Sequence, residues 1–339
     1  MTSRERVLAV LSGQPVDRPP VMCAGGMMTM ACTEVMAETG AGWPESHGDA
    51  ELMARLVSAF QQAAGFDNVG VPFCMTVEAE ALGSQVNYGS DSVQPRVSRE
   101  VLTSAGDWRD LNSDHGRARV PVVLEALTRL KAGLPDMAAV GNVVGPFSLA
   151  GSVVSPDRLL REVVRRPDEV RALLAWLTDW LERYGIAQVE AGAEVMAIAE
   201  PSATGEILGQ QGFAAFAAPY LRRLTEALRR AGAKVILHIC GDATDLGEAL
   251  GSLGADAVSV DGMVNLRWLK ELVGPVPVMG NVSAFTLARD RPAAVAERGR
   301  RALAQGADIL APACGVVPTT PLANLRAFAQ AAIQECRGG

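Results

Sequence analysis

Eight short apolar runs recur along the 339-residue chain, each followed by a polar or glycine-containing turn and then by a pattern of helical period. Runs that are apolar at nearly every position are typical of parallel strands buried on both faces. Eight such runs alternating with helices predict a (β/α)8 TIM barrel. The runs cover Pro20–Ala24, Asn68–Phe73, Met137–Val143, Val195–Glu200, Lys234–Cys240, Asp256–Asp261, Pro275–Asn281 and Asp308–Ala313.

Helical patterns separate the runs. Within Asp168–Ile186 one apolar stripe comprises Val170, Leu173, Leu174, Leu177, Leu181 and Tyr184. Comparable patterns cover Phe213–Ala231, Thr244–Leu253, Arg291–Ala304 and Pro321–Glu335. A short amphipathic helix at the N-terminus is stopped by Gly13 and Pro15. The sequence therefore predicts a barrel with an N-terminal helical extension.

No low-complexity linker, fixed-period repeat or shift in composition marks a domain boundary. We therefore expect residues 1–339 to form a single barrel domain, with the first 18 residues and Ala79–Pro135 as elaborations around it. A doubly wound open sheet is the alternative. It is disfavoured because no Gly-x-Gly-x-x-Gly follows the first run, where Gly25-Gly26 indicates only a turn.

A formal net charge of −7 and a pI near 5.2 argue against nucleic acid or an anionic membrane as a partner. No apolar run approaches the ~20 residues that span a bilayer. The apolar stretch at the N-terminus is also too short for a signal peptide. The six cysteines have no framework spacing, so we expect reduced thiols or metal ligands in a cytoplasmic protein.

His238, Cys240 and Cys314 are the candidate metal ligands, at the strand ends where such barrels carry their chemistry. His238 and Cys240 are two residues apart, so on a strand both point to the same side. Cys314 follows the last run, and its loop must reach over the barrel mouth. Two thiolates and one imidazole favour zinc over magnesium or calcium. Three protein ligands leave one corner of a tetrahedral site open, as in catalytic zinc sites.

A plainer alternative is that these cysteines are ordinary buried thiols, because free cysteine is often buried. Two further cysteines at strand ends, Cys23 and Cys74, are rival ligands, whereas Cys32 and Cys336 are expected to be inert.

Four more polar residues end predicted strands, namely Asn142, Glu200, Asp261 and Asn281. We predict that they bind substrate or orient the metal ligands. The alternative is that they cap helices or hold loops.

The remaining titratable candidates carry weaker signals. Glu78 and Glu80 begin a helical pattern, where carboxylates favour the positive end of a helix, although one could approach the metal. His47 and His115 lie in hydrophilic sequence and are expected to be exposed to solvent.

A zinc ion held by two thiolates suits a substrate thiol better than it suits water. A free thiol with a pKa near 8.5 must shift by roughly 1.5 units to be half ionised at pH 7, which is about 2 kcal/mol. Coordination deprotonates a thiol outright. Alkyl transfer to a thiol is the predicted reaction class, with hydrolysis as the competing use of such a site.

Motifs from about Arg4 to Leu325 resemble the methylcobamide:coenzyme M methyltransferases of the uroporphyrinogen decarboxylase superfamily. The resemblance rests on Arg4-Glu-Arg-Val-Leu, Asp17-Arg18-Pro-Pro, Val71-Pro-Phe-Cys-Met-Thr-Val-Glu-Ala-Glu80, Pro201-Ser-Ala-Thr-Gly, His238-Ile-Cys240-Gly-Asp242, Ser259-Val-Asp261, Gly280-Asn281-Val and Ala313-Cys314-Gly. It implies a barrel with zinc on His238, Cys240 and Cys314. It also implies a methylated corrinoid carried by a separate small protein, and a small acceptor such as zinc-bound coenzyme M.

Three alternatives remain at this point. The decarboxylase branch is expected to carry an arginine-bearing Gln-Ala-Gly-Arg segment, whereas Ala24–Met28 here has no cation. Tetrahydrofolate could be the acceptor, because the strand ends are acidic and amide-rich and Arg18 is the only basic residue close to one. A non-catalytic, zinc-stabilised corrinoid-binding subunit would need a fourth protein ligand.

Overall fold

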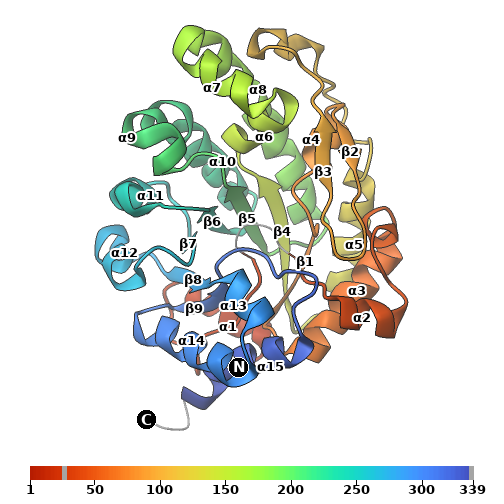
Figure 1. The fold of residues 1–339 in the computed structure, drawn as a ribbon, viewed down its shortest axis with the longest axis vertical. Helices are drawn as coiled ribbons and strands as arrows, with labels where there is room; N and C mark the ends of the chain where they lie inside the picture. The colour runs from red at the N-terminus through yellow and green to blue at the C-terminus, as the bar shows by residue number, and fades with distance from the viewer. Residues whose placement is uncertain (25–28, 336–339) are drawn as a thin grey trace.

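Seven parallel strands form a curled sheet at the centre of the computed structural model, which describes residues 1–24 and 29–335 (Figure 1). Gly25-Gly26 and Cys336 lie outside these residues. The strands in spatial order are β1 (Asn68–Val71), β4 (Ala138–Val144), β5 (Val195–Glu200), β6 (Lys234–Ile239), β7 (Ala257–Val260), β8 (Val278–Val282) and β9 (Ile309–Pro312). All are buried, except at the start of β6, as expected for parallel strands covered on both faces.

The first predicted strand is reduced to one bridge that completes the ring. Val21 pairs in parallel with Leu310 of β9, and its carbonyl accepts the Asp67 N–H at 2.7 Å just before β1. Beyond Val21, the backbone of Cys23 bonds to a side chain and not to a neighbouring strand. Asn68 Oδ1 accepts the Cys23 N–H at 2.9 Å, and Asn68 Nδ2 donates to the Cys23 carbonyl at 3.2 Å. The predicted barrel is confirmed, with this strand shortened.

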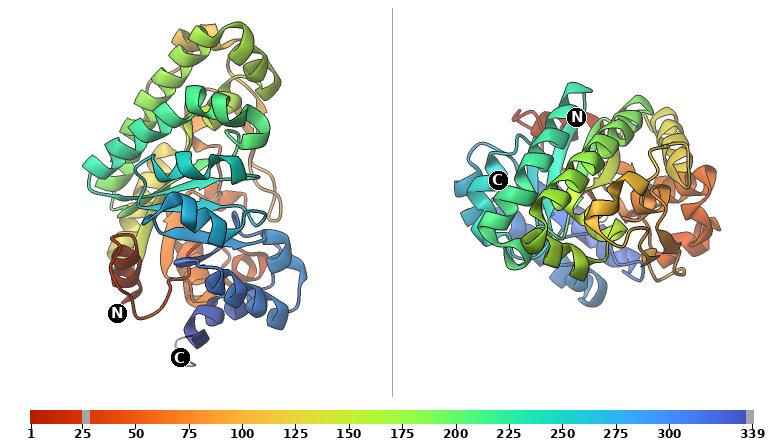
Figure 2. Two further views of the ribbon diagram at one scale, coloured as in Figure 1. Left: turned by 90° about the vertical axis from the view of Figure 1, so that its left-hand side faces the viewer. Right: turned by 90° about the horizontal axis from the view of Figure 1, so that it is seen from above.

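Helices cover the outer face of the sheet (Figure 2). They are α1 (Ser3–Val10), α2 (Thr33–Thr39), α3 (Ala50–Ala64), α4 (Val77–Ala81), α5 (Val120–Gly133), α6 (Pro146–Val153), α7 (Pro156–Arg165), α8 (Pro167–Glu190), α9 (Gly205–Phe216), α10 (Ala218–Arg230), α11 (Gly247–Gly251), α12 (Leu266–Val273), α13 (Ala284–Arg289), α14 (Pro292–Ala304) and α15 (Leu322–Glu335), with 3-10 turns η1 (Glu45–His47), η2 (Ala105–Asp110) and η3 (Thr244–Leu246). Within the described residues, no helix combines the length and apolar character that crossing a membrane requires.

Two helix predictions need correction. The predicted helix Phe213–Ala231 is divided at Ala217, because Pro219 lacks an N–H and lies in the first turn of α10. The segment Ala79–Pro135 is only partly an elaboration. It contains the hairpin of β2 (Gln85–Asn87) and β3 (Arg96–Arg99), but α5 is a regular outer helix that packs against α3 and β1.

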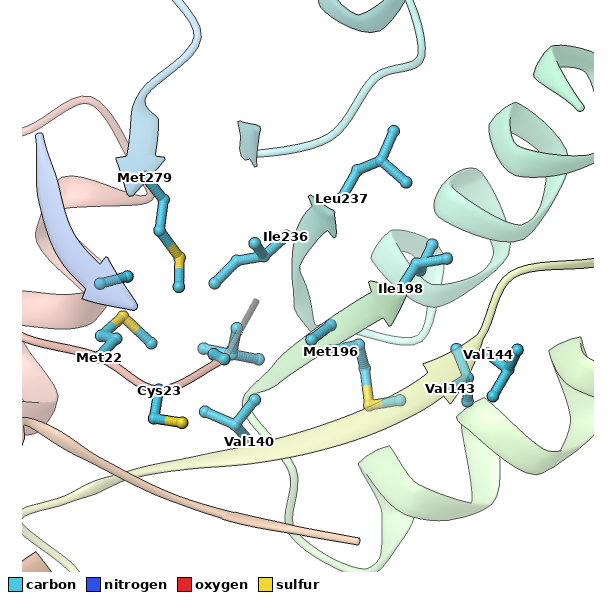
Figure 3. Packing of buried hydrophobic residues seen from close by; sticks show 14 of the residues in the cluster. Met22, Cys23, Val140, Val143, Val144, Met196, Ile198, Ile236, Leu237 and Met279 are labelled. Carbon is cyan, nitrogen blue, oxygen red and sulfur yellow. The ribbon is translucent and has the colours of Figure 1, made fainter. Parts of the chain in front are cut away.

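Apolar side chains fill the barrel between its two ends. Met22, Val140, Ile236 and Met279 come from four different segments and point toward one another (Figure 3). All four are fully buried. The interior is therefore a packed core, and polar chemistry is confined to the strand ends.

A buried ion network closes the amino end of the barrel. Asp67 is 1% exposed and accepts hydrogen bonds from Arg6 at 2.9 Å and from Arg18 at 2.8 Å. Arg18 therefore lies at the amino end of the sheet. The prediction that it is a cation near a functional strand end is wrong, because this carboxylate holds it at the opposite end.

Replacing Asp67 with Ala should destabilise the protein by about 3–5 kcal/mol, because Arg6 and Arg18 lose the buried carboxylate that they share, and Arg6 keeps the more exposed Asp17 as its partner. The measurement is the shift in the chemical unfolding midpoint. The control is Glu297→Ala, which removes exposed ion pairs with Arg300 and Arg301 and should leave the unfolding midpoint nearly unchanged. Equal effects of the two variants would contradict a structural role for the network.

Candidate metal centre

His238, Cys240 and Cys314 each offer one ligand atom, and these atoms all lie within 4.8 Å of one another. His238 Nε2 is 3.1 Å from Cys240 Sγ, which is 3.7 Å from Cys314 Sγ. The imidazole is fully buried and the two thiols are half-buried. The three predicted ligands thus come together from segments that are far apart in the sequence.

The path of the loop after β9 explains how Cys314 reaches β6. Strands β7 and β8 separate β6 from β9 in the sheet. Directly after β9, the Ala313 N–H donates to the Val282 carbonyl at 2.8 Å, so the chain continues beside β8 for one more residue. Cys314 then leaves this edge and extends over the mouth toward Cys240.

Ser259 orients the imidazole. It pairs in register with His238 across β6 and β7, and its Oγ lies 2.9 Å from His238 Nδ1. Engaging Nδ1 leaves Nε2 directed at the two sulfurs. Ligating histidines are commonly oriented in this way. No sequence motif marks this role of Ser259, although it follows from the parallel register of β6 and β7.

Asp261 and Asn281 hold the loops that frame the centre. Asp261 Oδ2 accepts the N–H of Gly241, the residue that follows Cys240, at 3.3 Å. Asn281 Nδ2 donates to the carbonyls of Asp261 and Val264, at 2.8 Å each. These contacts correspond to the loop-holding alternative and fix the backbone beside one metal-ligand candidate.

Asn142 is buried near the end of β4, and its backbone N–H and carbonyl both bond to Gln188 of α8. It pairs in register with Ala197. Two steps further along the same parallel strands, Ala199 pairs with His238, so Asn142 shares the inner face of the sheet with His238.

Glu200 is directed away from the metal centre. It pairs in register with Ile239, which lies between His238 and Cys240 and so faces the opposite side of the sheet. Its Oε2 accepts the N–H groups of Phe147 and Ser148 at the start of α6. These contacts correspond to the helix-capping alternative for Glu200.

Burial raises the pKa of Glu200 to about 7. A carboxyl group whose folded pKa lies above its unfolded value stabilises the fold fully at low pH, and the contribution declines as pH rises from about 4.5 through 7. Glu200→Gln should therefore lose less stability than wild type between pH 5 and 8. The measurement is the unfolding midpoint against pH. Glu297→Gln is the control, because Glu297 is exposed and its arginine partners lower its pKa. The unfolding midpoint of this variant should change between pH 5 and 8 as that of the wild type does.

Neither Cys23 nor Cys74 joins the three-ligand cluster. Cys23 is fully buried, and burial raises its pKa to about 12. Cys74 Sγ instead accepts a hydrogen bond from Arg119 at 3.2 Å. Cys32 is fully buried beside the first turn of α2.

Arg119 is a buried cation that our sequence analysis missed, because it lies in an irregular segment before α5. Its guanidinium bonds to Glu80 at 2.6 Å, to Thr76 at 2.8 Å and to Cys74. Glu78 lies nearby, and burial raises its pKa to about 7 while its Oε1 accepts the Val144 N–H. Glu80 is therefore the ion-pair partner of Arg119, and Glu78 binds the backbone at the end of β4.

Both remaining histidines differ from prediction. His47 is 1% exposed and packs against Trp43, with ring centroids 4.6 Å apart, and burial lowers its pKa to about 3. His115 is half-buried and stacks on Trp180 at 4.4 Å. The prediction that they are solvent-exposed is wrong, because Trp43 and Phe73 cover the ring of His47 and Trp180 covers that of His115.

Comparisons with known proteins agree with the geometry. A family model described as uroporphyrinogen decarboxylase (URO-D) matches residues 2–334. Methylcobamide:CoM methyltransferase MtbA of Methanosarcina acetivorans is 34% identical over 335 residues, covering 98% of this chain and 97% of that protein. The chain belongs to the methylcobamide:CoM methyltransferase branch of the uroporphyrinogen decarboxylase family.

Other relatives agree with this placement. Methylcobamide:CoM methyltransferase MtaA of Methanosarcina barkeri is 33% identical over 336 residues, covering 97% of each chain. A solved methyltransferase from Methanosarcina mazei superposes with a TM-score of 0.93 at 32% identity and covers 99% of both chains. The family resemblance inferred from the motifs is confirmed.

Ser259→Ala should weaken zinc binding roughly 10–100-fold, because the His238 ring loses the group that orients it. The measurement is a competition titration against a chromophoric chelator. Ser252→Ala is the matched control, since its hydroxyl only bonds the Ala249 carbonyl at a helix end. Unchanged affinity in Ser259→Ala would remove Ser259 from the site.

Proposed function

We propose that this methylcobamide:CoM methyltransferase family member moves a methyl group from a methylated corrinoid, carried by a separate small protein, to a small thiol. The observation that carries the proposal is the meeting of His238, Cys240 and Cys314 at the carboxyl ends of the strands. We further propose that residues 1–339 act as a single barrel domain.

The donor set fits zinc. Two thiolates and one imidazole form a soft set with three protein ligands, which leaves a position for an exogenous ligand. A bound zinc ion would supply the positive charge that lowers the pKa of an acceptor thiol. His238, Cys240 and Cys314 would hold the ion, and Ser259 keeps the imidazole turned toward it.

The transfer balances as a nucleophilic displacement. The acceptor thiol loses its proton, and its sulfur forms a bond to the methyl carbon. The carbon–cobalt bond breaks, and its electron pair stays with cobalt as cob(I)alamin. Asp261 and Asn281 keep the Gly241 backbone fixed, so the sulfur of Cys240 holds its position while donor and acceptor approach.

Cys240→Ala and Cys314→Ala should each lose stoichiometric zinc and lower the activity at least 100-fold while the barrel stays folded, because the described part of the chain supplies three donors to the cluster and each variant removes one. Zinc content, circular dichroism and the decay of methylcobalamin absorbance with added thiol are measured. Cys32→Ala, which removes a buried thiol outside the cluster, is the matched control. Full zinc occupancy in both ligand variants would refute this donor set.

The same assay separates the alternative functions. Coenzyme M, homocysteine and tetrahydrofolate are offered separately, and we expect demethylation of methylcobalamin with a thiol and not with the folate. A zinc-edge spectrum that does not change on adding thiol would instead indicate a non-catalytic subunit with a closed metal site. Decarboxylation of uroporphyrinogen is not expected.

A further inference from the structure

Four large apolar side chains are exposed beside the metal-ligand candidates, and we call them the apolar rim. Val93 is 51% exposed, Ile207 47%, Met263 63% and Phe285 66%. Val93 lies in the hairpin that follows β1, and the other three follow β5, β7 and β8, so all four lie at the carboxyl end of the barrel. Single exposed apolar side chains are common, but several that gather at one place indicate a binding surface.

Val93 and Phe285 lie on two sides of Cys314. Val93, at the tip of the hairpin between β2 and β3, lines a groove of about 390 Å³ together with Cys314. Ala284 begins α13, directly precedes Phe285 and lines the same groove. The Arg289 guanidinium lies 5.4 Å from the centroid of the Phe285 ring and packs against it. Both members of the rim therefore border the space onto which Cys314 opens.

Met263 lies in the loop after β7, and this loop contacts both of its neighbours at the mouth. A Cβ on the adjacent Gly262 would lie 3.5 Å from Ala313 Cβ and 3.6 Å from Ser283 Cα. Ala313 precedes the third metal-ligand candidate, and Ser283 precedes α13. The Met263 loop therefore packs between the loop after β9 and the start of α13.

Ile207 lies beside the other cysteine of the centre, Cys240. It belongs to the first turn of α9, next to Glu206. A Cβ on Gly241, the residue after Cys240, would lie 3.6 Å from Glu206 Oε2. The apolar rim thus borders both sulfur ligands with side chains from four different segments.

Acids outnumber cations around the apolar rim. The stretches that contain its four side chains have no Lys or Arg. They are residues 56–95, 184–221, 235–266 and 271–288. Asp91 is exposed close to Val93, and Glu206 is exposed next to Ile207. The surface around the metal ligands can therefore bury apolar area and accept hydrogen bonds from N–H donors.

A corrin ring matches this surface. It is a broad, nearly flat macrocycle with methyl groups on its faces and neutral amide arms at its edge. The methyl groups can pack on apolar side chains, and the amide N–H groups can donate to carboxylates. In the displacement proposed above, sulfur, methyl carbon and cobalt must lie in one line. The ring must then lie across the barrel mouth, with its edge over the residues that border the metal centre.

We infer that Val93, Ile207, Met263 and Phe285 form the binding surface for the corrin ring of the methyl donor. This inference rests on the proposed function and names the residues that hold its donor. Contacts from four separate segments would fix the tilt of the ring, and this tilt decides whether the methyl carbon lies in line with the acceptor sulfur.

Free methylcobalamin is the probe. Calorimetry without a thiol gives its Kd, and the decay of its absorbance with an added thiol gives KM and kcat. Phe285→Ala and Met263→Ala each remove apolar contact area, so each should raise Kd and KM about 5–10-fold. Both variants should affect KM more than kcat, because the metal ligands are retained.

Two further variants control the measurement. Val164→Ala truncates an exposed apolar side chain on α7, outside the apolar rim, and should leave Kd, KM and kcat unchanged. Phe285→Leu keeps much of the apolar area and should hold Kd within about 2-fold of the wild-type value.

The outcomes separate the two proposals. If the wild-type protein demethylates methylcobalamin with none of the thiols offered, the proposed function fails, and the inference fails with it. If the wild type is active but Phe285→Ala and Met263→Ala keep its Kd and KM, only the inference is overturned, and the apolar rim would instead contact the protein that carries the corrinoid. An equal effect of Val164→Ala would also overturn it.

Discussion

Parallel pairing of β6 with β7 fixes the position of the imidazole on which the metal centre depends. The register sets Ser259 beside His238, and the two-residue spacing on the strand sends Cys240 to the same side. Parallel pairing of β8 with β9 then carries the chain to Cys314 along the same edge. A shift of one residue in either pair would turn these side chains to the helix side of the sheet.

Charge is divided between the two ends of the barrel. At the amino end, Arg6 and Arg18 converge on Asp67, so cations there stabilise the closure of the ring at Val21. At the carboxyl end, two buried carboxylates, Glu78 and Glu200, bind backbone N–H groups on either side of Gly145. Arg6 and Arg18 thus reinforce the fold at the amino end, whereas the carboxyl end carries acids, soft donors and one buried cation, Arg119, which is bonded to Glu80 and Cys74.

Several features of the site could be predicted from the sequence because they depend on local spacing. The strand ends and the His238–Cys240 pair follow from periodicity alone. The outward direction of the Glu200 side chain also follows from strand alternation. Glu200 pairs with Ile239, the neighbour of His238, and therefore faces the opposite side of the sheet. The burial of Arg119 and His47 could not be predicted, since it depends on packing against Glu80 and Phe73, which belong to other segments of the chain.

The scarcity of basic side chains near the metal centre bears on the reactivity of the acceptor sulfur. A thiolate acceptor carries negative charge before transfer, and the thioether product carries none. A nearby Lys or Arg would stabilise the reactant more than the product and would lower the nucleophilicity of the sulfur. The strand ends here hold Asp261 and Asn281, whose groups bind backbone and not an incoming anion. The side chains around the centre therefore add no positive charge of their own to an acceptor thiolate, which keeps its sulfur nucleophilic.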